Sequence, residues 1–312
     1  LGDGGGATYV RVGSEPAHGY KVQSADGAWW EGQVRDGVIN VRATGAVCDV
    51  SGDFNATSSA AHTAENVRIA AATDDTAAIQ TAIDYAMDKD QDGSSAQPVT
   101  VLLSGLSRIT DTIHLGYGNT VGSVYLKGLA ESYRGEDTMA GRTGLVCTFS
   151  DRPMVNFQGV RRGGIGRMFL RYGLDYSGVT ATNTGLTPTV ESNWDAVKAA
   201  SQYAPGAAIT VDAYSGTEPG SPYPDATYPA HESQTQYGKS ASSGVEIEGM
   251  FIRNAQVAIC VKPSDDSSNA DFVSIKRLVI EFCKYGISIG NGQSRSVSVE
   301  DVNMGRVWTC LV

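Results

Sequence analysis

The sequence predicts an all-β fold built as a β-solenoid, and three observations carry this prediction. One phrase occurs three times, as Val245–Val261 (VEIEGMFIRNAQVAICV), Val273–Ile289 (VSIKRLVIEFCKYGISI) and Val297–Val312 (VSVEDVNMGRVWTCLV), with starts 28 and 24 residues apart. Each copy reads as an alternating strand, a small or polar break and a second alternating strand. The chain contains 37 Gly among 312 residues and is only 19% charged, which suits turns and short strands. Repeats of this length bury their apolar faces by stacking.

The three copies align residue by residue, so the sequence predicts which side chains share an interior stack. Alternation fixes the register, because a slip of one residue would turn every apolar side chain outward. The aligned sets are Ile247, Ile275 and Val299; Met250, Leu278 and Val302; Ile252, Ile280 and Met304; and Ile259, Ile287 and Leu311.

An earlier copy is interrupted. Ile165–Tyr172 (IGRMFLRY) matches Ile247–Asn254 (IEGMFIRN), and Ala208–Val211 (AITV) matches AICV in the same later copy. We interpret the two pieces as halves of one rung, separated by an insertion at about 173–206. A second insertion, at about 212–244, precedes the regular copies.

The chain opens with a glycine-rich segment, LGDGGGATYV, followed by SADGAWWE at Ser24–Glu31. The glycines favour a tight turn over a phosphate-binding loop, because no Lys-Ser/Thr pair follows and no strand precedes. Val38–Val47 alternates as a first strand, and Cys48–Ala72 is polar and Ala-rich, as expected of a loop.

The segment Thr73–Met87 (TDDTAAIQTAIDYAM) predicts a helix, at about 73–88, with Asp74 as its N-cap. Ile79 and Ile83 belong to one apolar face at helical spacing. We expect this single helix to cap the open end of the stack, which would otherwise expose strand edges.

These motifs together resemble a known family. GDGGGATYV, DGAWWE, a strand ending in GAV, TDDTAAIQTAIDYA and VTVLLSGLSRITDTI at Val99–Ile113 occur in the order found in bacteriophage tailspikes and related pectate-lyase-like proteins. The resemblance covers about residues 1–115 by motif and the rest by repeat pattern. Two departures stand out: about 25 extra residues between Ala46 and Thr73, and Leu103-Ser104-Gly105 in place of Pro-x-Gly.

The resemblance implies a right-handed parallel β-helix at 38–312, continuing beyond residue 312, behind an attachment or neck segment at 1–37. It implies a virion spike, assembled in the bacterial cytoplasm as a homotrimer and joined to other tail or head proteins, that binds host surface polysaccharide such as capsule and could cleave it. Two alternatives stay open: a non-catalytic structural or adhesive spike of a phage or gene transfer agent, and a free polysaccharide lyase or hydrolase.

Asp88–Gly93 (DKDQDG) has the spacing of a calcium loop, with Asp88, Asp90 and Asp92 as candidate ligands. Position twelve is Val99 instead of Glu, and a strand follows in place of a helix. The sequence therefore favours a hydrophilic turn over a calcium site, and it indicates no other cofactor.

The two insertions contain aromatic residues that could stack on sugar rings. Packing of these rings within the protein is an equal alternative. The candidate ligand-binding residues are Trp194, Tyr203, Tyr214, Tyr223, Tyr228 and Tyr237.

Glycoside hydrolysis needs two carboxyl groups about 5–9.5 Å apart. In the alignment, Glu248, Lys276 and Glu300 coincide, which favours a salt-bridged ladder over a catalytic pair. Asp301 and Glu281 are the other catalytic candidates, and none stands above the rest.

The net charge of −10 argues against a nucleic-acid partner, and no apolar run approaches the ~18 residues of a membrane span. Five Cys match no metal motif. We expect Cys260, Cys283 and Cys310 to pack as small apolar groups in the repeat strands, which is typical of folding in a reducing compartment.

Overall fold

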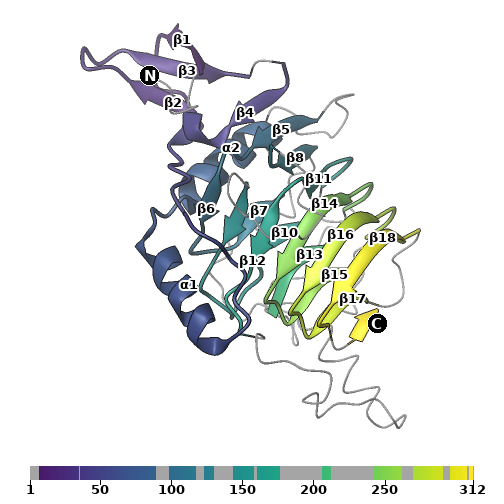
Figure 1. Cartoon of the computed structure of the whole chain (residues 1–312). Helices are drawn as coiled ribbons and strands as arrows, with labels where there is room; N and C mark the ends of the chain where they lie inside the picture. The colour runs from purple at the N-terminus through teal and green to yellow at the C-terminus, as the bar shows by residue number, and fades with distance from the viewer. Residues whose placement is uncertain are drawn as a thin grey trace.

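A computed structural model of the chain describes residues 7–34, 36–88, 98–116, 123–129, 143–157, 160–175, 206–211, 242–261, 270–290, 296–307 and 309–311. These residues form mostly parallel β-sheet with few helices, in a β-helix-like stack (Figure 1). We call one pass of the chain along the stack a rung, and each rung from β5 onward contributes to each of three faces, while β4 contributes to the first face alone.

The first face contains β4 (Val38–Asn40), β5 (Val99–Leu102), β8 (Val124–Lys127), β11 (Gly164–Gly166) and the first halves of β14 (Glu246–Arg253), β16 (Ser274–Glu281) and β18 (Ser298–Gly305). The second face contains β6 (Leu106–Arg108), β9 (Gly144–Val146), β12 (Phe169–Arg171) and the second halves of β14, β16 and β18. The third face contains β7 (Ile113–Leu115), β10 (Val155–Phe157), β13 (Ala207–Val211), β15 (Val257–Val261), β17 (Tyr285–Ile289) and β19 (Thr309–Leu311).

The register predicted from the repeats is confirmed. Ile247 pairs with Ile275, and Ile275 pairs with Val299. The interrupted copy aligns as expected, because Ile165 pairs with Ile247. Val299 is nevertheless 37% exposed, since no described strand pairs with β18 on the side away from β16.

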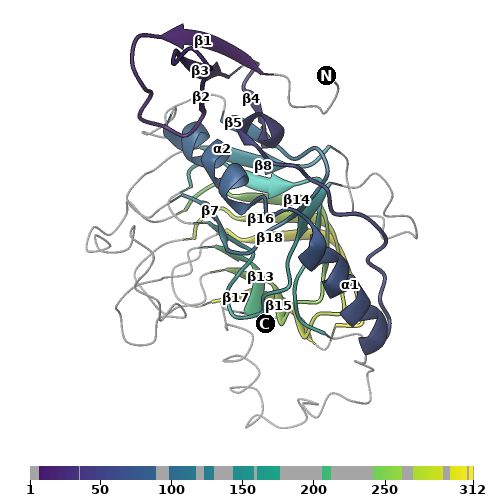
Figure 2. The same cartoon turned by 90° about the vertical axis from the view of Figure 1, so that its left-hand side faces the viewer.

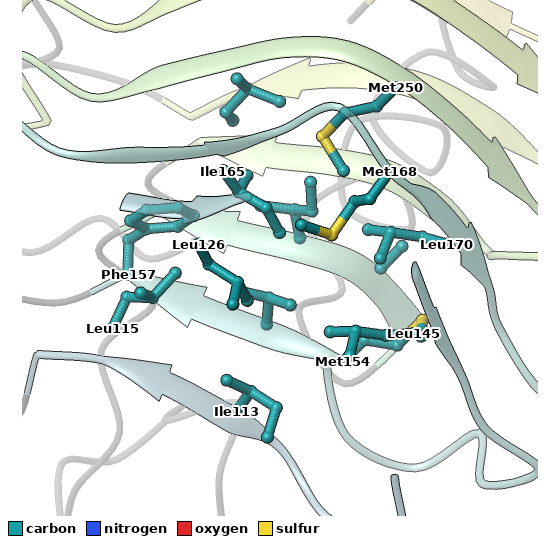
Figure 3. Packing of buried hydrophobic residues seen from close by; sticks show 14 of the residues in the cluster. Ile113, Leu115, Leu126, Leu145, Met154, Phe157, Ile165, Met168, Leu170 and Met250 are labelled. Carbon is teal, nitrogen blue, oxygen red and sulfur yellow. The ribbon is translucent and has the colours of Figure 1, made fainter. Parts of the chain in front are cut away.

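The core lies between the three faces. Ile165, Leu170 and Phe157 enter it from the first, second and third faces, and all three are buried (Figure 3). Met168 and Met250 fill the space near the corner between the first two faces. Unbranched methionine fits such an irregular gap.

Three rows of residues in the left-handed conformation turn the corners of the rungs. The row before the first face contains Arg162, Gly244, Phe272 and Ser296. The row between the first and second faces contains Arg167, Gly249, Arg277 and Asp301. The row between the second and third faces contains Asn254, Phe282 and Arg306. Most are not glycine, although positive φ is costly for other residues. The stacked strands on either side therefore impose this conformation.

Helix α2 (Thr76–Asp88) lies where the sequence predicts it, but it begins three residues later than Thr73. Asp74 accepts a hydrogen bond from the backbone NH of Thr76 at 3.1 Å, but the N-cap position is one residue later, because the Asp75 carbonyl accepts the first bond within the helix. Ile79 and Ile83 are fully buried among the strands of the first rungs. The buried Asp75 carboxylate accepts hydrogen bonds from the backbone NH groups of Val47 and Cys48, and so fixes the preceding segment to the helix.

The expectation of a single helix and of a loop at Cys48–Ala72 is wrong. Helix α1 (Ser59–Ala71) forms within this segment and lies along the outside of the second face (Figures 1 and 2). Ser58 caps it by accepting a hydrogen bond from the NH of Ala61. Its buried face carries His62 and Glu65 beside Ile69, so the sequence shows no apolar stripe.

The first strand is also shorter than predicted. β4 ends at Asn40, and a 3₁₀ helix, η1 (Val41–Thr44), follows. Asn40 accepts a hydrogen bond from the NH of Arg42, and Gly45 ends the turn at φ 105°. These local bonds remove residues 41–47 from the sheet.

The N-terminal residues form a three-stranded antiparallel sheet of β1 (Thr8–Val12), β2 (Lys21–Gln23) and β3 (Trp29–Gln33). The glycine-rich turn predicted just before β1 lies outside the described residues. Tyr20 packs edge-on against Tyr85 of α2 at 5.0 Å between ring centroids, and Tyr85 donates a hydrogen bond to the carbonyl of Gly32. A side chain at Gly32 would strike the Tyr20 ring, so this contact requires glycine.

Cys48, Cys147, Cys260 and Cys283 are buried free thiols, and burial raises the pKa of the Cys283 thiol to about 12. The packing role predicted for Cys260 and Cys283 agrees with this burial, whereas Cys310 is exposed in β19. No helix in the described ranges is long and apolar enough to cross a membrane.

Candidate binding site on the first face

The outward side chains of the first face form two neighbouring rows. The first row contains Tyr125, Gly164, Glu246, Ser274 and Ser298, and the second contains Lys127, Gly166, Glu248, Lys276 and Glu300. Residues two apart on a strand point to the same side, so each strand contributes one residue to each row. We call these residues, with Arg277, the polar cluster.

Two glycines divide the polar cluster. A side chain at Gly164 or Gly166 would strike the backbone oxygen of Glu246 or Glu248, so glycine is required at both positions. With no side chain in between, Tyr125 lies close enough to the Glu246 carboxylate across β11 for that charge to act on its hydroxyl group.

Tyr125 is neutral in this arrangement. Burial, followed by the charge of Glu246, raises its pKa to about 12. The Lys127 ammonium lies 4.0 Å from the centroid of the Tyr125 ring. A cation over an aromatic face is attracted to it, which fixes the ring between a cation and a carboxylate.

Glu248 is held by two cations. Its Oε2 lies 3.2 Å from Lys276 Nζ and 3.0 Å from Arg277 Nη2. Burial raises the pKa of Glu248, but the hydrogen bonds and charges of Lys276 and Arg277 outweigh burial, and the pKa lies below its usual value. Glu248 is therefore ionised at neutral pH.

The structure places the four catalytic candidates on different parts of the rungs. Glu248 and Glu300 share a row, with Lys276 between them, which puts the two strands roughly 10 Å apart. Asp301 is exposed at the corner beside Glu300. Glu281 lies on the second face, where its carboxylate is 3.8 Å from Arg253 Nε.

Glu246 and Glu248 point to the same side of β14, and residues two apart on one strand lie roughly 7 Å apart. A glycosidase pair needs one carboxyl that keeps its proton as the general acid. Glu248 cannot serve as that acid, because Lys276 and Arg277 hold it ionised. Its geometry suits hydrogen-bond acceptance instead.

The remaining predicted site residues fall largely outside the described ranges. All six insertion aromatics, Trp194 to Tyr237, lie there, and so do Asp90 and Asp92. Asp88 is the last residue of α2. Across the part of the chain that the structure describes, no three His, Cys, Asp or Glu residues gather as metal ligands would.

Sequence reasoning missed Tyr125, Lys127 and the partnership with Glu246. A signal was present, because Gly164-Ile165-Gly166 places two glycines within a strand, which indicates close approach of another group. Tyr125 on β8 approaches Glu246 on β14 across the strand between them, β11. The sequence does not show this, because β8 is short and does not match the repeated phrase.

The four arginines clustered between Val160 and Tyr172 in the sequence do not form one site. Arg162 and Arg167 turn two different corners, and Arg171 is fully buried on the second face. Charged residues that are close in the sequence thus point in different directions, because the chain turns around the rung between them.

No protein-family model matches the chain, and no curated protein matches its sequence. Among solved structures, the chain is similar to the enzymatically active domain of tailspike protein 2 of bacteriophage CBA120, at 14% identity and a TM-score of 0.38, covering 96% of this chain and 39% of that one. It is similar to the Agl-KA catalytic domain at 9% identity and a TM-score of 0.40, covering 91% and 39%. A third match is ORF18 of Geobacillus virus E2, at 13% identity and a TM-score of 0.34, covering 87% and 41%. The chain spans less than half the length of each.

Proposed function

We propose that this chain is part of a virion spike that binds a host surface polysaccharide. The tailspike-like order of motifs in residues 1–115 and the in-register parallel rungs support the proposal. The proposal includes a right-handed closed coil capped by α2, an attachment role for residues 1–37, and a homotrimeric assembly. Light scattering at micromolar concentration tests the last point, and a monomeric mass would contradict it.

The observation that carries the proposal is the polar cluster on the first face. It presents fixed acceptors, Glu246 and Glu248, beside fixed donors, Lys276 and Arg277, and one aromatic ring. Sugar rings offer hydroxyl groups to both kinds of partner and apolar faces to aromatic rings. Because the cluster stands on stacked strands, little conformational entropy is lost when a ligand binds.

Binding without cleavage is the better-supported form of this function at the polar cluster. Both cations that contact Glu248 keep it ionised, so Glu248 could serve as a base or nucleophile but not as the general acid. Cleavage would need a protonated carboxyl group as the second member of a pair. Binding needs only the fixed donors and acceptors, and this requirement favours the adhesive-spike alternative.

The test is an array of purified bacterial capsular and O-antigen polysaccharides, probed with the labelled chain and with Glu246→Gln and Tyr125→Ala variants. We expect both variants to lose roughly tenfold in affinity for any polysaccharide that the parent chain binds, because each loses about 1–2 kcal/mol of contact. Glu15→Gln is the matched control, since Glu15 is an exposed glutamate paired with Lys21 on the N-terminal sheet.

The outcomes separate the candidate surfaces. Unchanged binding by both variants would rule out the polar cluster. Loss of binding in Trp194→Ala, Tyr223→Ala or Tyr228→Ala alone would move the site to the insertions. Release of reducing sugar ends by the parent chain would show cleavage and contradict the adhesive form.

A further inference from the structure

Helix α1 is attached to the second face by an apolar contact and a polar contact. The apolar contact joins Phe54 and Ile69 to Phe169, Phe251 and their neighbours on the outside of the sheet. The Phe54 and Phe169 ring centroids are 6.0 Å apart. Removal of α1 together with the preceding segment that carries Phe54 would therefore expose a stripe of aromatic and aliphatic side chains running across several rungs.

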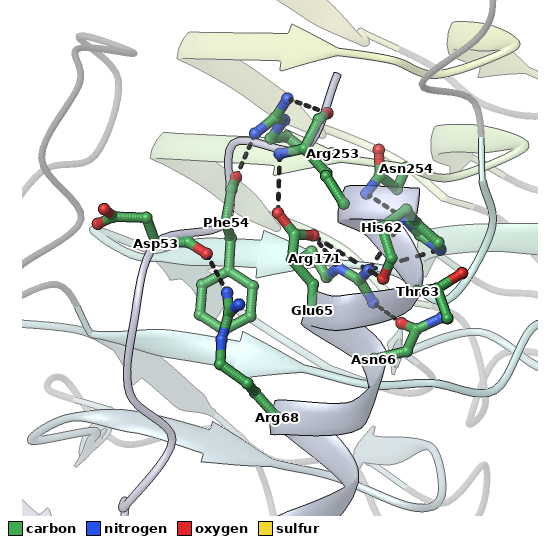
Figure 4. A network of polar contacts seen from close by, with 12 residues as sticks. Asp53, Phe54, His62, Thr63, Glu65, Asn66, Arg68, Arg171, Arg253 and Asn254 are labelled. Atoms are coloured by element: carbon green, nitrogen blue, oxygen red, sulfur yellow. Dashed lines mark hydrogen bonds and ion pairs between the residues drawn. The ribbon is translucent and has the colours of Figure 1, made fainter. Parts of the chain in front are cut away.

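The polar contact centres on Arg171, which is fully buried (Figure 4). Its guanidinium donates hydrogen bonds to Glu65 Oε2, at 3.2 Å from Nε and 3.1 Å from Nη2. It also donates to Asn66 Oδ1 on α1 and to the carbonyl of Cys147 on the sheet. Arg253, in the same row of the sheet, donates to the backbone carbonyls of Phe54 and Ala56.

The His62 ring completes this network as an acceptor. Arg171 Nη2 lies 3.0 Å from His62 Nδ1, and Asn254 Nδ2 lies 3.4 Å from the same atom. A guanidinium has donors only, so Nδ1 must be unprotonated. The backbone of Gly173 favours the protonated ring, but burial and Arg171 outweigh it and lower the pKa of His62. His62 therefore fits this site only as the neutral imidazole.

We propose that α1 is an acid-released latch: protonation of His62 places a cation against Arg171 in a buried site, and α1 detaches from the second face. The consequence is exposure of the apolar stripe that contains Phe169 and Phe251. The latch is independent of the binding function proposed for the first face, because no residue of the polar cluster contributes to it.

The charges around His62 leave a new cation poorly compensated. On α1, Glu65 is already engaged by Arg171, and Arg68 adds positive charge. On the sheet, Glu281 lies 3.8 Å from Arg253, and no acidic group on the second face contacts the ring in the described ranges. Asp175, exposed after β12, is the one charge that favours protonated His62 besides Glu65. Cys147 and Cys283 are buried and neutral.

Burial and the charge of Arg171 lower the pKa of His62 from its ordinary value of 6.5, despite Asp175 and Glu65. With α1 detached, His62 regains the ordinary value. The contribution of neutral His62 to the attachment of α1 is therefore complete above pH 6.5. It is lost as the pH falls from 6.5 through the lower pKa that His62 has in the attached state. Each pH unit within that window shifts the opening equilibrium by about tenfold.

Hydrogen exchange of the full chain at pH 7.5 and pH 5.5, corrected for intrinsic exchange, tests the latch. We expect peptides from α1 to lose protection at pH 5.5, while peptides from β14 and β16 keep theirs. His62→Gln supplies a neutral acceptor that does not titrate, so its α1 protection should be the same at both pH values. His18→Gln is the control, because His18 lies on the N-terminal sheet beside Glu31.

Constant α1 protection in the parent chain down to pH 5.5 would overturn the proposal. An equal loss of protection in His62→Gln would also overturn it, because another group would then be responsible. If His62→Gln does not fold, ¹⁵N chemical shifts of the imidazole in the parent chain give the same decision. A ring that is protonated at pH 7.5, or one whose protonation leaves the α1 amide signals unchanged, would contradict the latch.

Discussion

In the later rungs, single left-handed residues turn the corners and recur at the same position from one rung to the next. Phe272 and Phe282 occupy two of these corners with nearly equal φ, 56° and 52°. Phe272 is 62% exposed. Phe282 is buried, with the guanidinium carbons of Arg253 and Arg306 each 4.6 Å from its ring centroid.

This pair separates backbone strain from side-chain packing. Phe272→Gly relieves a strained residue and loses little contact, so we expect the free energy of unfolding to stay level or rise by about 1 kcal/mol. Phe282→Gly relieves the same strain but removes a buried ring, and we expect a loss on the order of 3–5 kcal/mol. Denaturant unfolding of both variants is the measurement. Equal effects at the two corners would show that the buried Phe282 ring contributes no packing energy, and would contradict this account.

For single residues, the sequence predicts well which interior side chains stack on one another and predicts poorly which outward side chains meet. The pairing of Ile247 with Ile275 and Val299 follows from alternation, because burial constrains every second residue. Nothing constrains the outward residues in the same way, so the contact between Tyr125 and Glu246 could not be inferred from their separation in the sequence.

At the scale of elements, α1 shows why a helix can escape notice. Its buried positions include His62 and Glu65, and their partner Arg171 lies more than 100 residues away in the chain. An amphipathic pattern can be read from the sequence when most buried positions of a helix are apolar, and in α1 only Ile69 is. The buried face of α2 is apolar, and the sequence predicts its start to within three residues.

The ion pair under α1 gives a prediction at the same scale. Arg171→Met leaves Glu65 buried without its cation, so we expect a loss of roughly 3–5 kcal/mol in unfolding free energy or detachment of α1. The double variant Arg171→Met/Glu65→Met removes both charges and should recover most of this loss. Circular dichroism melts of the single and double variants provide the comparison. A double variant as unstable as the single one would mean that the pair acts through its hydrogen bonds to other groups.

Helix α2 provides a second prediction. Ile79→Asp and Ile83→Asp each place a carboxylate against the first rungs, where both isoleucines are fully buried, and should cost several kcal/mol. Ala77→Asp puts the same group on the exposed side of the first helical turn and should be nearly neutral. Thermal melts decide: an unchanged melting temperature for Ile83→Asp would show that α2 does not cover the end of the stack.

At the scale of the whole molecule, the stack determines which outward residues meet. The polar cluster on the first face and the latch on the second both join residues from distant parts of the chain. Tyr125 and Glu246 approach each other because β8, β11 and β14 are neighbours, and Arg171 lies beside Arg253 because β12 pairs with β14. The register between rungs is therefore the claim on which the site and the latch both depend.

Cysteine cross-linking measures that register directly. Ser274 and Ser298 are paired outward residues on β16 and β18, with strands about 4.8 Å apart, whereas Val299 is the next residue and points to the other side. In a Cys310→Ser background, we expect Ser274→Cys/Ser298→Cys to cross-link rapidly with a short bismaleimide and Ser274→Cys/Val299→Cys to cross-link far more slowly. A faster reaction of the second pair, or no reaction in either, would contradict the stacked register and with it the site on the first face.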